Sequence, residues 1–165
     1  MFKQSLTAAA FLMAASAYAA DVPITGNVAS KCTIYTDTQG VYGNPLPNTL
    51  STLPADGGVK PVIRYDVVNG GMYKAVIATP DEFTSSPEID DVLDWEGSVA
   101  VAEVSDAQMS DYENNKVLYD NVTEIELTVA GSTWFDVTSS VDYGVGKALP
   151  GGTYRALVSA ECIAL

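Results

Sequence analysis

The sequence predicts an all-β protein folded as an antiparallel β-sandwich of about seven strands. Short runs of the chain alternate apolar and polar residues with a period of two, as strands with one buried face do. Clusters of glycine, proline and asparagine separate these runs at short intervals, and a helical period is almost absent. Alternating runs with frequent turn signals are typical of two sheets packed face to face.

The first 19 residues are predicted to be a secretory signal peptide. One cation, Lys3, precedes an apolar run at 6–17, and a small-x-small cleavage site follows at 17–19. The mature chain is therefore expected to start at Ala20 and to be exported. No later stretch approaches the roughly 20 uncharged apolar residues that a spanning helix needs, so no membrane span is expected.

The mature chain, residues 20–165, is about the usual size of a single domain with one core. Removing Lys3 leaves 7 basic residues against 21 acidic residues, a net charge of −14. Because phosphate binding depends on cationic contacts, we expect no nucleic-acid partner, and the same charge disfavours an anionic membrane surface. Histidine is absent, so the commonest general base and metal ligand are missing.

The chain has two cysteines, Cys32 and Cys162, near opposite ends of the mature part. In an exported protein such a pair favours a disulfide, and two buried free thiols are the alternative. A disulfide between residues 130 positions apart would stabilise the fold by about 4 to 5 kcal/mol in the chain-entropy treatment. It would also tie the first strand of the domain to the last.

The first half of the mature chain is expected to form strands around a long proline- and glycine-rich loop. The loop covers 37–58, with one short strand near 49–53, and follows a strand at 20–36. Another strand is expected at 59–68, and its alternation places one set of side chains in the core. These core-facing residues are Ile63, Tyr65 and Val67.

Two tight-turn signals each join a pair of alternating runs, Asn-Gly-Gly at 69–71 and Gly-Ser at 131–132. Such turns between β-like runs are typical of β-hairpins. We therefore expect antiparallel pairing of the two runs on either side of each turn. The predicted hairpins join 59–68 to 72–79 and 122–130 to 133–138.

The acidic segment at 80–97 is expected to be a loop with a short helix at 87–94, because its apolar residues have helical spacing. Its carboxylates also suggest calcium, but their spacing does not match a calcium-binding loop. A solvated loop is the preferred interpretation, and no metal site is predicted. Beyond it, a strand is expected at 98–104 and a polar loop or one helical turn at 107–115.

The end of the chain carries a turn followed by one more strand. Pro150, Gly151 and Gly152 make the turn, and Tyr154 follows it. Along 154–162 every second residue, ending with the second cysteine, lies on one face of the expected strand. The opposite face carries Leu157 and Ile163.

The mature N-terminus has an alternating run of its own at 21–35. One face of this extended strand carries Val22, Ile24, Gly26 and Val28. Because the strand starts within a few residues of the expected N-terminus, it has no upstream chain to pair with. Two arrangements remain open: the strand folds back onto its own domain, or it pairs with another chain.

Two short motifs, one near each end of the chain, are similar to parts of one known family. One is Thr-Gly-Asn-Val at 25–28, within a strand that precedes Cys32, and the other is Leu-Pro-Gly-Gly-Thr-Tyr at 149–154. The first is similar to the donor segments of archaic and alternative-type pilins, and the second to the turn that opens their last strand. With the signal peptide, the chain thus resembles subunits of chaperone–usher fimbriae.

The resemblance implies an immunoglobulin-like sandwich that lacks one strand and has an open hydrophobic groove. A periplasmic chaperone fills such a groove first, and the N-terminal segment of the next subunit then replaces it, which is donor-strand complementation. Residues 21–30 would be the donor segment. Its inserted side chains would be Val22, Ile24 and Val28, and Gly26 would lie where two backbones approach closely.

By the same resemblance, the protein is a structural or adhesive subunit of a bacterial surface fimbria, or pilus. Its expected partners are other copies of the chain or related pilin subunits, the periplasmic chaperone and an outer-membrane usher. The chain would pass through the periplasm and end at the cell surface or outside the cell.

No residues suggest catalysis. Without histidine a serine or cysteine nucleophile lacks its usual base, and among 21 acidic residues a close carboxylate pair is uninformative. We therefore expect no enzyme activity and no cofactor. The alternative function is a self-contained secreted sandwich that binds a sugar or a protein as a monomer. Scattered aromatic residues, among them Tyr35, Tyr42 and Trp134, would suit sugar binding.

Overall fold

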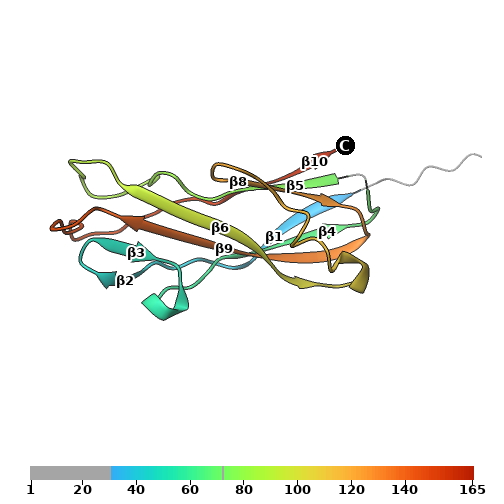
Figure 1. Ribbon diagram of the computed structural model, residues 1–165, viewed down its shortest axis with the longest axis horizontal. Coiled ribbons are helices and arrows are strands. Elements are labelled where there is room, and N and C mark those ends of the chain that lie inside the picture. Colours follow the sequence, from blue (N-terminus) through green and yellow to red (C-terminus); the bar gives the residue numbers. More distant parts are fainter. Residues whose placement is uncertain (1–30, 72) are drawn as a thin grey trace, which may run out of the picture.

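The computed structural model describes residues 31–71 and 73–165, which form two antiparallel sheets packed face to face (Figure 1). Within these residues the chain forms ten strands and two single-turn 3-10 helices, so the predicted all-β antiparallel sandwich is confirmed. Outside them lie the predicted signal peptide and the predicted donor residues Val22, Ile24, Gly26 and Val28.

The first sheet is built around its longest strand, β9 (Gly131–Asp142). Its other strands are β1 (Cys32–Thr38), β2 (Gly43–Leu46), β3 (Thr49–Ser51), β4 (Val62–Val67) and β6 (Asp94–Val104). On one side β9 pairs with β4 over its first half and with β3 near its end, and on the other side it pairs with β6. β1 then pairs with β4, and β2 pairs with β3.

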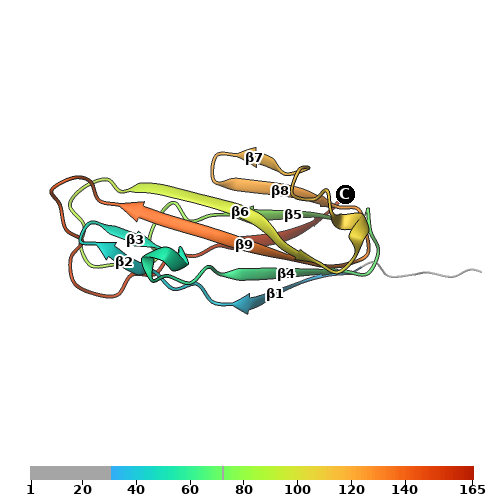
Figure 2. The same ribbon diagram turned by 60° about the horizontal axis from the view of Figure 1, so that its bottom comes forward.

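The second sheet is shorter. Its strands are β5 (Tyr73–Ala78), β7 (Val117–Tyr119), β8 (Val122–Leu127) and β10 (Ser159–Ala164). Their order is β10-β5-β8-β7, and the sheet lies over the half of the first sheet that contains β1 and β4 (Figure 2). The two 3-10 turns, η1 (Pro54–Asp56) and η2 (Ala107–Met109), lie in connections.

The core lies between the two sheets, where alternating faces of β4, β5, β8 and β9 meet. The residues of β4 predicted to face the core, Ile63, Tyr65 and Val67, are buried. Tyr65 packs edge-to-face on Phe135, with ring centroids 5.5 Å apart. Its hydroxyl donates to the carbonyl oxygens of Val76 and Glu161, at 3.3 and 3.2 Å. One tyrosine of the first sheet therefore bonds to two strands of the second.

Both predicted hairpins are wrong, because each turn carries the chain from one sheet to the other. β4 lies between β1 and β9, whereas β5 lies between β10 and β8, and the turn at 131–132 likewise leads from β8 to β9. The amide of Gly71 donates to the carbonyl oxygen of Leu127 at 2.7 Å, and a Cβ on Gly70 would lie 2.3 Å from the carbonyl oxygen of Thr128. The glycines thus form an arch packed against the end of β8. Alternation shows which face a strand buries but not which strand it pairs with.

The connections also differ from the prediction in part. The segment 80–93 contains no helix, and Asp94 already belongs to β6, so the predicted helix at 87–94 is wrong. The backbone pairing of β6 with β9 outweighs a helical spacing of only a few apolar residues. The loop at 37–58 holds two short paired strands, β2 and β3, where a single one was expected. The helical turn expected within 107–115 is present as η2.

An aromatic cluster covers the half of the first sheet that the second sheet leaves free. Phe83, from the irregular segment, lies at its centre, with ring centroids 4.7 Å from Trp95, 5.0 Å from Tyr154 and 6.4 Å from Tyr42. Trp95 is paired with Val141 of β9, whose side chain is buried on the inner face. The first sheet therefore carries a partly buried aromatic cluster outside the main core.

Candidate functional site: an open side between two edge strands

β1 and β10 are edge strands of different sheets, and the disulfide places them on the same side of the sandwich. In the part of the chain that the structure describes, β1 has β4 as its only strand partner and β10 has β5. An edge strand presents backbone amides and carbonyls that can pair with another strand. We call the region between β1 and β10 the open side.

The predicted disulfide is confirmed and spans the open side. Cys32, the first residue of β1, is bonded to Cys162 in β10, with their Cα atoms 6.4 Å apart. Both cysteines are partly buried and pack against the core. The bond therefore joins the two sheets at the end of the molecule where β1 begins.

Apolar side chains line the open side without being sealed from solvent. Ile34 of β1, Val158 and Ala160 are only partly buried, although all three pack against the core cluster. The alternation predicted for the last strand holds here, because Leu157 and Ile163 on its opposite face are 70% and 41% exposed. The core therefore extends to the open side, where backbone edges and apolar side chains occur together.

The predicted final turn lies beyond the other end of β10. The hydroxyl of Tyr154 donates to the carbonyl oxygen of Pro150 at 2.5 Å and so fastens the turn that contains Gly151 and Gly152. β10 itself begins only at Ser159, later than predicted. Arg155 instead forms an isolated bridge with Ser85, in which each amide donates to the other residue's carbonyl oxygen, at 2.8 and 3.3 Å. Pairing with the 80–93 segment thus replaces the first part of the expected strand.

The opposite side of the sandwich is closed by side chains that the sequence analysis did not single out. Glu113 accepts a hydrogen bond from the amide of Val101 in β6 at 2.7 Å, and Lys116 donates to the carbonyl oxygen of Val99 at 2.7 Å. The two side chains also pair with each other at 2.5 Å. They occupy backbone groups of the β6 edge that would otherwise be free to bind a strand.

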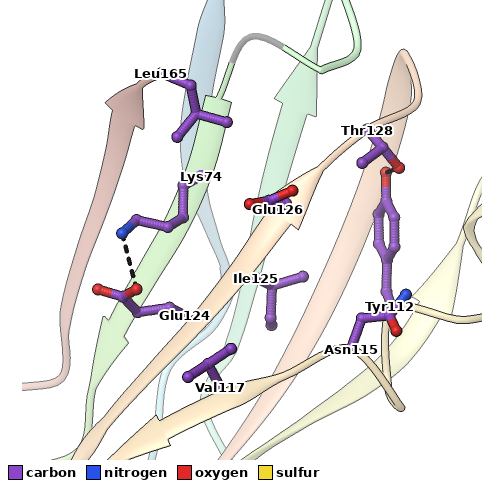
Figure 3. A pocket seen from close by; sticks show the side chains of 9 residues that line it. All are labelled: Lys74, Tyr112, Asn115, Val117, Glu124, Ile125, Glu126, Thr128 and Leu165. Atoms are coloured by element: carbon purple, nitrogen blue, oxygen red, sulfur yellow. Dashed lines mark hydrogen bonds and ion pairs between the residues drawn. The ribbon is translucent and has the colours of Figure 1, made fainter.

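Below this pair the same segment is anchored in the core. Met109 and Tyr112 are buried, and the Tyr112 hydroxyl accepts a hydrogen bond from the amide of Val129 at 2.9 Å. The sequence could have indicated this burial, because two large residues, Met109 and Tyr112, lie three positions apart in a segment interpreted as a polar loop or one helical turn. Tyr112 also lines a hollow of about 280 Å³. Figure 3 shows its lining side chains, among which Lys74 is paired with Glu124. The Nζ–Oε2 distance of this pair is 2.8 Å.

The β2 edge is also protected. Pro45 lies within this four-residue strand and lacks the amide that pairing requires, and Pro47 directly follows it. The Asn44 side chain donates to the carbonyl oxygens of Leu46 and Thr49, at 2.6 and 2.8 Å. The open side is therefore distinguished from both other edges of the first sheet, because we find no comparable capping of β1 in the described residues.

Two of the aromatic residues considered for sugar binding are engaged in a ladder on the outer face of the first sheet. The guanidinium carbon of Arg64 lies 4.6 Å from the ring centroid of Tyr35 and 5.8 Å from that of Trp134. The Trp134 indole donates to Asp37 at 2.7 Å, and Arg64 forms an ion pair with the same carboxylate at 3.3 Å. Arg64 therefore covers part of both rings, while Tyr35 stays 44% exposed.

No family model matches the chain, and no curated protein or solved structure is similar enough to count as a match. Within residues 31–71 and 73–165, no helix is both long and apolar enough to cross a membrane. The same residues contain no group of three or more cysteine or carboxylate side chains placed to hold a metal ion. The disulfide is consistent with an oxidising compartment.

Proposed function

We propose that this protein is an exported structural or adhesive subunit of a surface fibre, in which one copy lends a strand to the next. The observation that carries the proposal is the open side, where two strand edges that have no partner strand among the described residues flank partly buried apolar side chains. Within the first sheet, the β6 and β2 edges are capped by side chains or prolines, which supports a role in pairing for the β1 edge.

The dimensions of the chain suit this assembly. Residues 21–30, the proposed donor segment, would extend over about 33 Å as a strand, and the six residues of β10 cover about 20 Å. Val22, Ile24 and Val28 would lie on the face toward Ile34 and the inner face of β10. Because β1 begins at the disulfide-bonded end, a donor segment that precedes β1 would reach a neighbouring copy from that end, which would favour a head-to-tail fibre.

A periplasmic chaperone and an outer-membrane usher are the partners that this function requires. An open apolar edge is costly for a free monomer in water, so a temporary strand from a chaperone would protect it during export. Delivery to the cell surface would then follow the exchange of that strand for the donor segment of the next copy.

The proposal is tested by the oligomeric state of the mature protein, measured by size-exclusion chromatography with light scattering. We expect concentration-dependent ladders or filaments from the full mature chain and none from a variant lacking 21–30. The double variant Ile24→Asp/Val28→Asp should also stay monomeric. Its matched control, Thr25→Asp/Asn27→Asp, places the same charges on the opposite face and should still assemble.

The second candidate is a self-contained binding module that works as a monomer. The disulfide favours it, because a covalent bond across the open side stabilises the sandwich without a donor strand. If the mature chain and the variant lacking 21–30 are monomers of equal stability, strand donation is wrong and this candidate replaces it.

A further inference from the structure

Within the described residues, Arg155 and Lys31 are the two cations for which no acidic partner is found. Among the described residues the paired cations are Lys60, Arg64, Lys74, Lys116 and Lys147, each within ion-pair distance of a carboxylate. Arg155 is exposed, and no ion pair or side-chain hydrogen bond is found for its guanidinium in the described part of the chain. Of these two described cations, only Arg155 lines a cavity.

The same arginine lines a cavity of about 380 Å³ next to the aromatic cluster. Tyr42 and Tyr154 also line it, together with apolar and glycine residues from three segments, 40–42, Leu50 of β3 and 152–156. None of the described residues that line this cavity is acidic. The cavity thus combines one positive charge with two aromatic rings in a protein whose net charge is strongly negative.

The groups around the cavity are held in place by bonds that do not use the guanidinium. The Tyr42 hydroxyl is hydrogen-bonded to Ser139 at 2.8 Å, and the Tyr154 hydroxyl donates to Pro150. Burial raises the pKa of Tyr42, so this ring stays neutral at ordinary pH. The backbone of Arg155 is fixed by its bridge to Ser85. The rings are therefore positioned, and none of the described residues engages the guanidinium.

We propose that this cavity binds the carboxylate of an acidic saccharide, such as a uronic or sialic acid. A guanidinium matches a carboxylate through two parallel hydrogen bonds, and it keeps its charge at any physiological pH. The tyrosine rings offer apolar surface to the body of a small ligand, as is usual in ligand pockets of a few hundred Å³. The proposal does not depend on strand donation and would give the protein an adhesive function.

Isothermal titration calorimetry on the full mature chain tests the site with D-glucuronate and N-acetylneuraminate as probes. D-glucose serves as a neutral sugar for comparison. The α-amide of N-acetylaspartate, which keeps its side-chain carboxylate, serves as a carboxylate that has no sugar ring. We expect saturable binding of at least one sugar acid and binding at least about tenfold weaker, or absent, for both comparison compounds.

Variants locate the binding. Arg155→Gln should weaken binding by about tenfold or more, whereas Lys147→Gln, which removes an exposed cation that does not line the cavity, should change it by less than about twofold. Ala156→Leu fills the cavity while leaving the arginine in place and should also abolish binding. Thermal unfolding shows whether Arg155→Gln is folded. If that variant is poorly folded, Ala156→Leu still tests the site.

Several results would overturn the proposal. Equal binding of glucose would show that the carboxylate is not recognised, and binding of the aspartate amide alone would identify an acidic peptide as the partner. Equal effects of Arg155→Gln and Lys147→Gln, or no binding of either sugar acid at millimolar concentration, would also contradict it. None of these outcomes bears on whether the chain polymerises.

Discussion

Glu113 and Lys116 take the place of a neighbouring strand along β6. Each bonds to a backbone group of the strand edge, and each also bonds to the other, so both the polar edge and the two charges are satisfied. Burial alone would raise the pKa of Glu113, but the hydrogen bonds from Lys116 and Val101 and the lysine charge outweigh it and leave the pKa lowered. The carboxylate therefore acts in its ionised form.

The lowered pKa predicts a pH-dependent contribution to folding. Since the folded state holds the carboxylate at a lower pKa than the unfolded chain, its stabilisation is fully present above the unfolded value of about 4.3 and is lost as the pH falls through the folded pKa. Glu113→Gln should therefore lower the free energy of unfolding at pH 6 and lower it by less at pH 3. Urea unfolding at both pH values measures this difference.

A matched control for this measurement is Glu126→Gln, since Glu126 is exposed and no hydrogen bond or ion pair is found for it within the described residues. Its effect on stability should be small at both pH values. If Glu113→Gln and Glu126→Gln behave alike across the pH range, the pair with Lys116 does not stabilise β6.

Tyr65 connects the two sheets through its buried ring and its hydroxyl. Its ring is buried, and its hydroxyl bonds to carbonyl oxygens of β5 and β10. Tyr65→Phe keeps the ring and removes the hydroxyl, so we expect it to lower the free energy of unfolding by about 1 kcal/mol. Urea unfolding tests this, with Tyr119→Phe as control, because Tyr119 is 60% exposed. Equal stability of the two variants would contradict the prediction.

At the scale of elements, the faces of the strands follow from the sequence but their partners do not. The alternation in β4 and β8 identifies the buried sides correctly, because burial acts on each side chain through its own position. The turns after these strands look like hairpin turns, yet each is an arch between sheets. β4 can bury its inner face only against a strand of the other sheet, and this requirement appears only when both sheets are considered.

The edges could be predicted only in part for the same reason. Pro45 and Pro47 mark a strand edge in the sequence itself, because proline lacks an amide. The residues that cap β6, Glu113 and Lys116, lie in a loop 12 and 17 residues beyond their partners Val101 and Val99. No local sequence pattern shows that this loop folds back onto the strand edge. The cysteine pair of the open side could be inferred, since composition and predicted export together favour a disulfide.

The disulfide is the element-scale feature with the largest expected effect on stability. Because it closes a loop of 130 residues, removing it should increase the entropy of the unfolded chain, and we expect Cys32→Ser/Cys162→Ser to lower the free energy of unfolding by about 2 to 5 kcal/mol. Urea unfolding measures the change. A reducing agent should destabilise the natural protein similarly and leave the double variant unaffected, and unchanged stability in both would contradict the prediction.

For the whole molecule, the fold class could be predicted from the composition and the period-two alternation of the sequence. Of the candidate sites, only single residues could be predicted, and not how they come together. Tyr42, Tyr154 and Arg155 are each visible in the sequence, but nothing in their spacing shows that they line one cavity. Phe83 contacts both Tyr42 and Tyr154, although it lies in an acidic segment that was predicted to be a solvated loop. Contacts between distant loops depend on the packing of the entire chain, and a local pattern does not contain them.

The bond between β1 and β10 also determines how the molecule would respond to a pulling force. A load applied between the chain before Cys32 and the chain after Cys162 passes through the disulfide and does not reach the residues enclosed between them. If the enclosed chain could unfold under the load, the distance between its ends would increase by on the order of 400 Å. The disulfide prevents this extension, because it holds residues 32 and 162 together. Under such a load the domain would behave as a short, inextensible link.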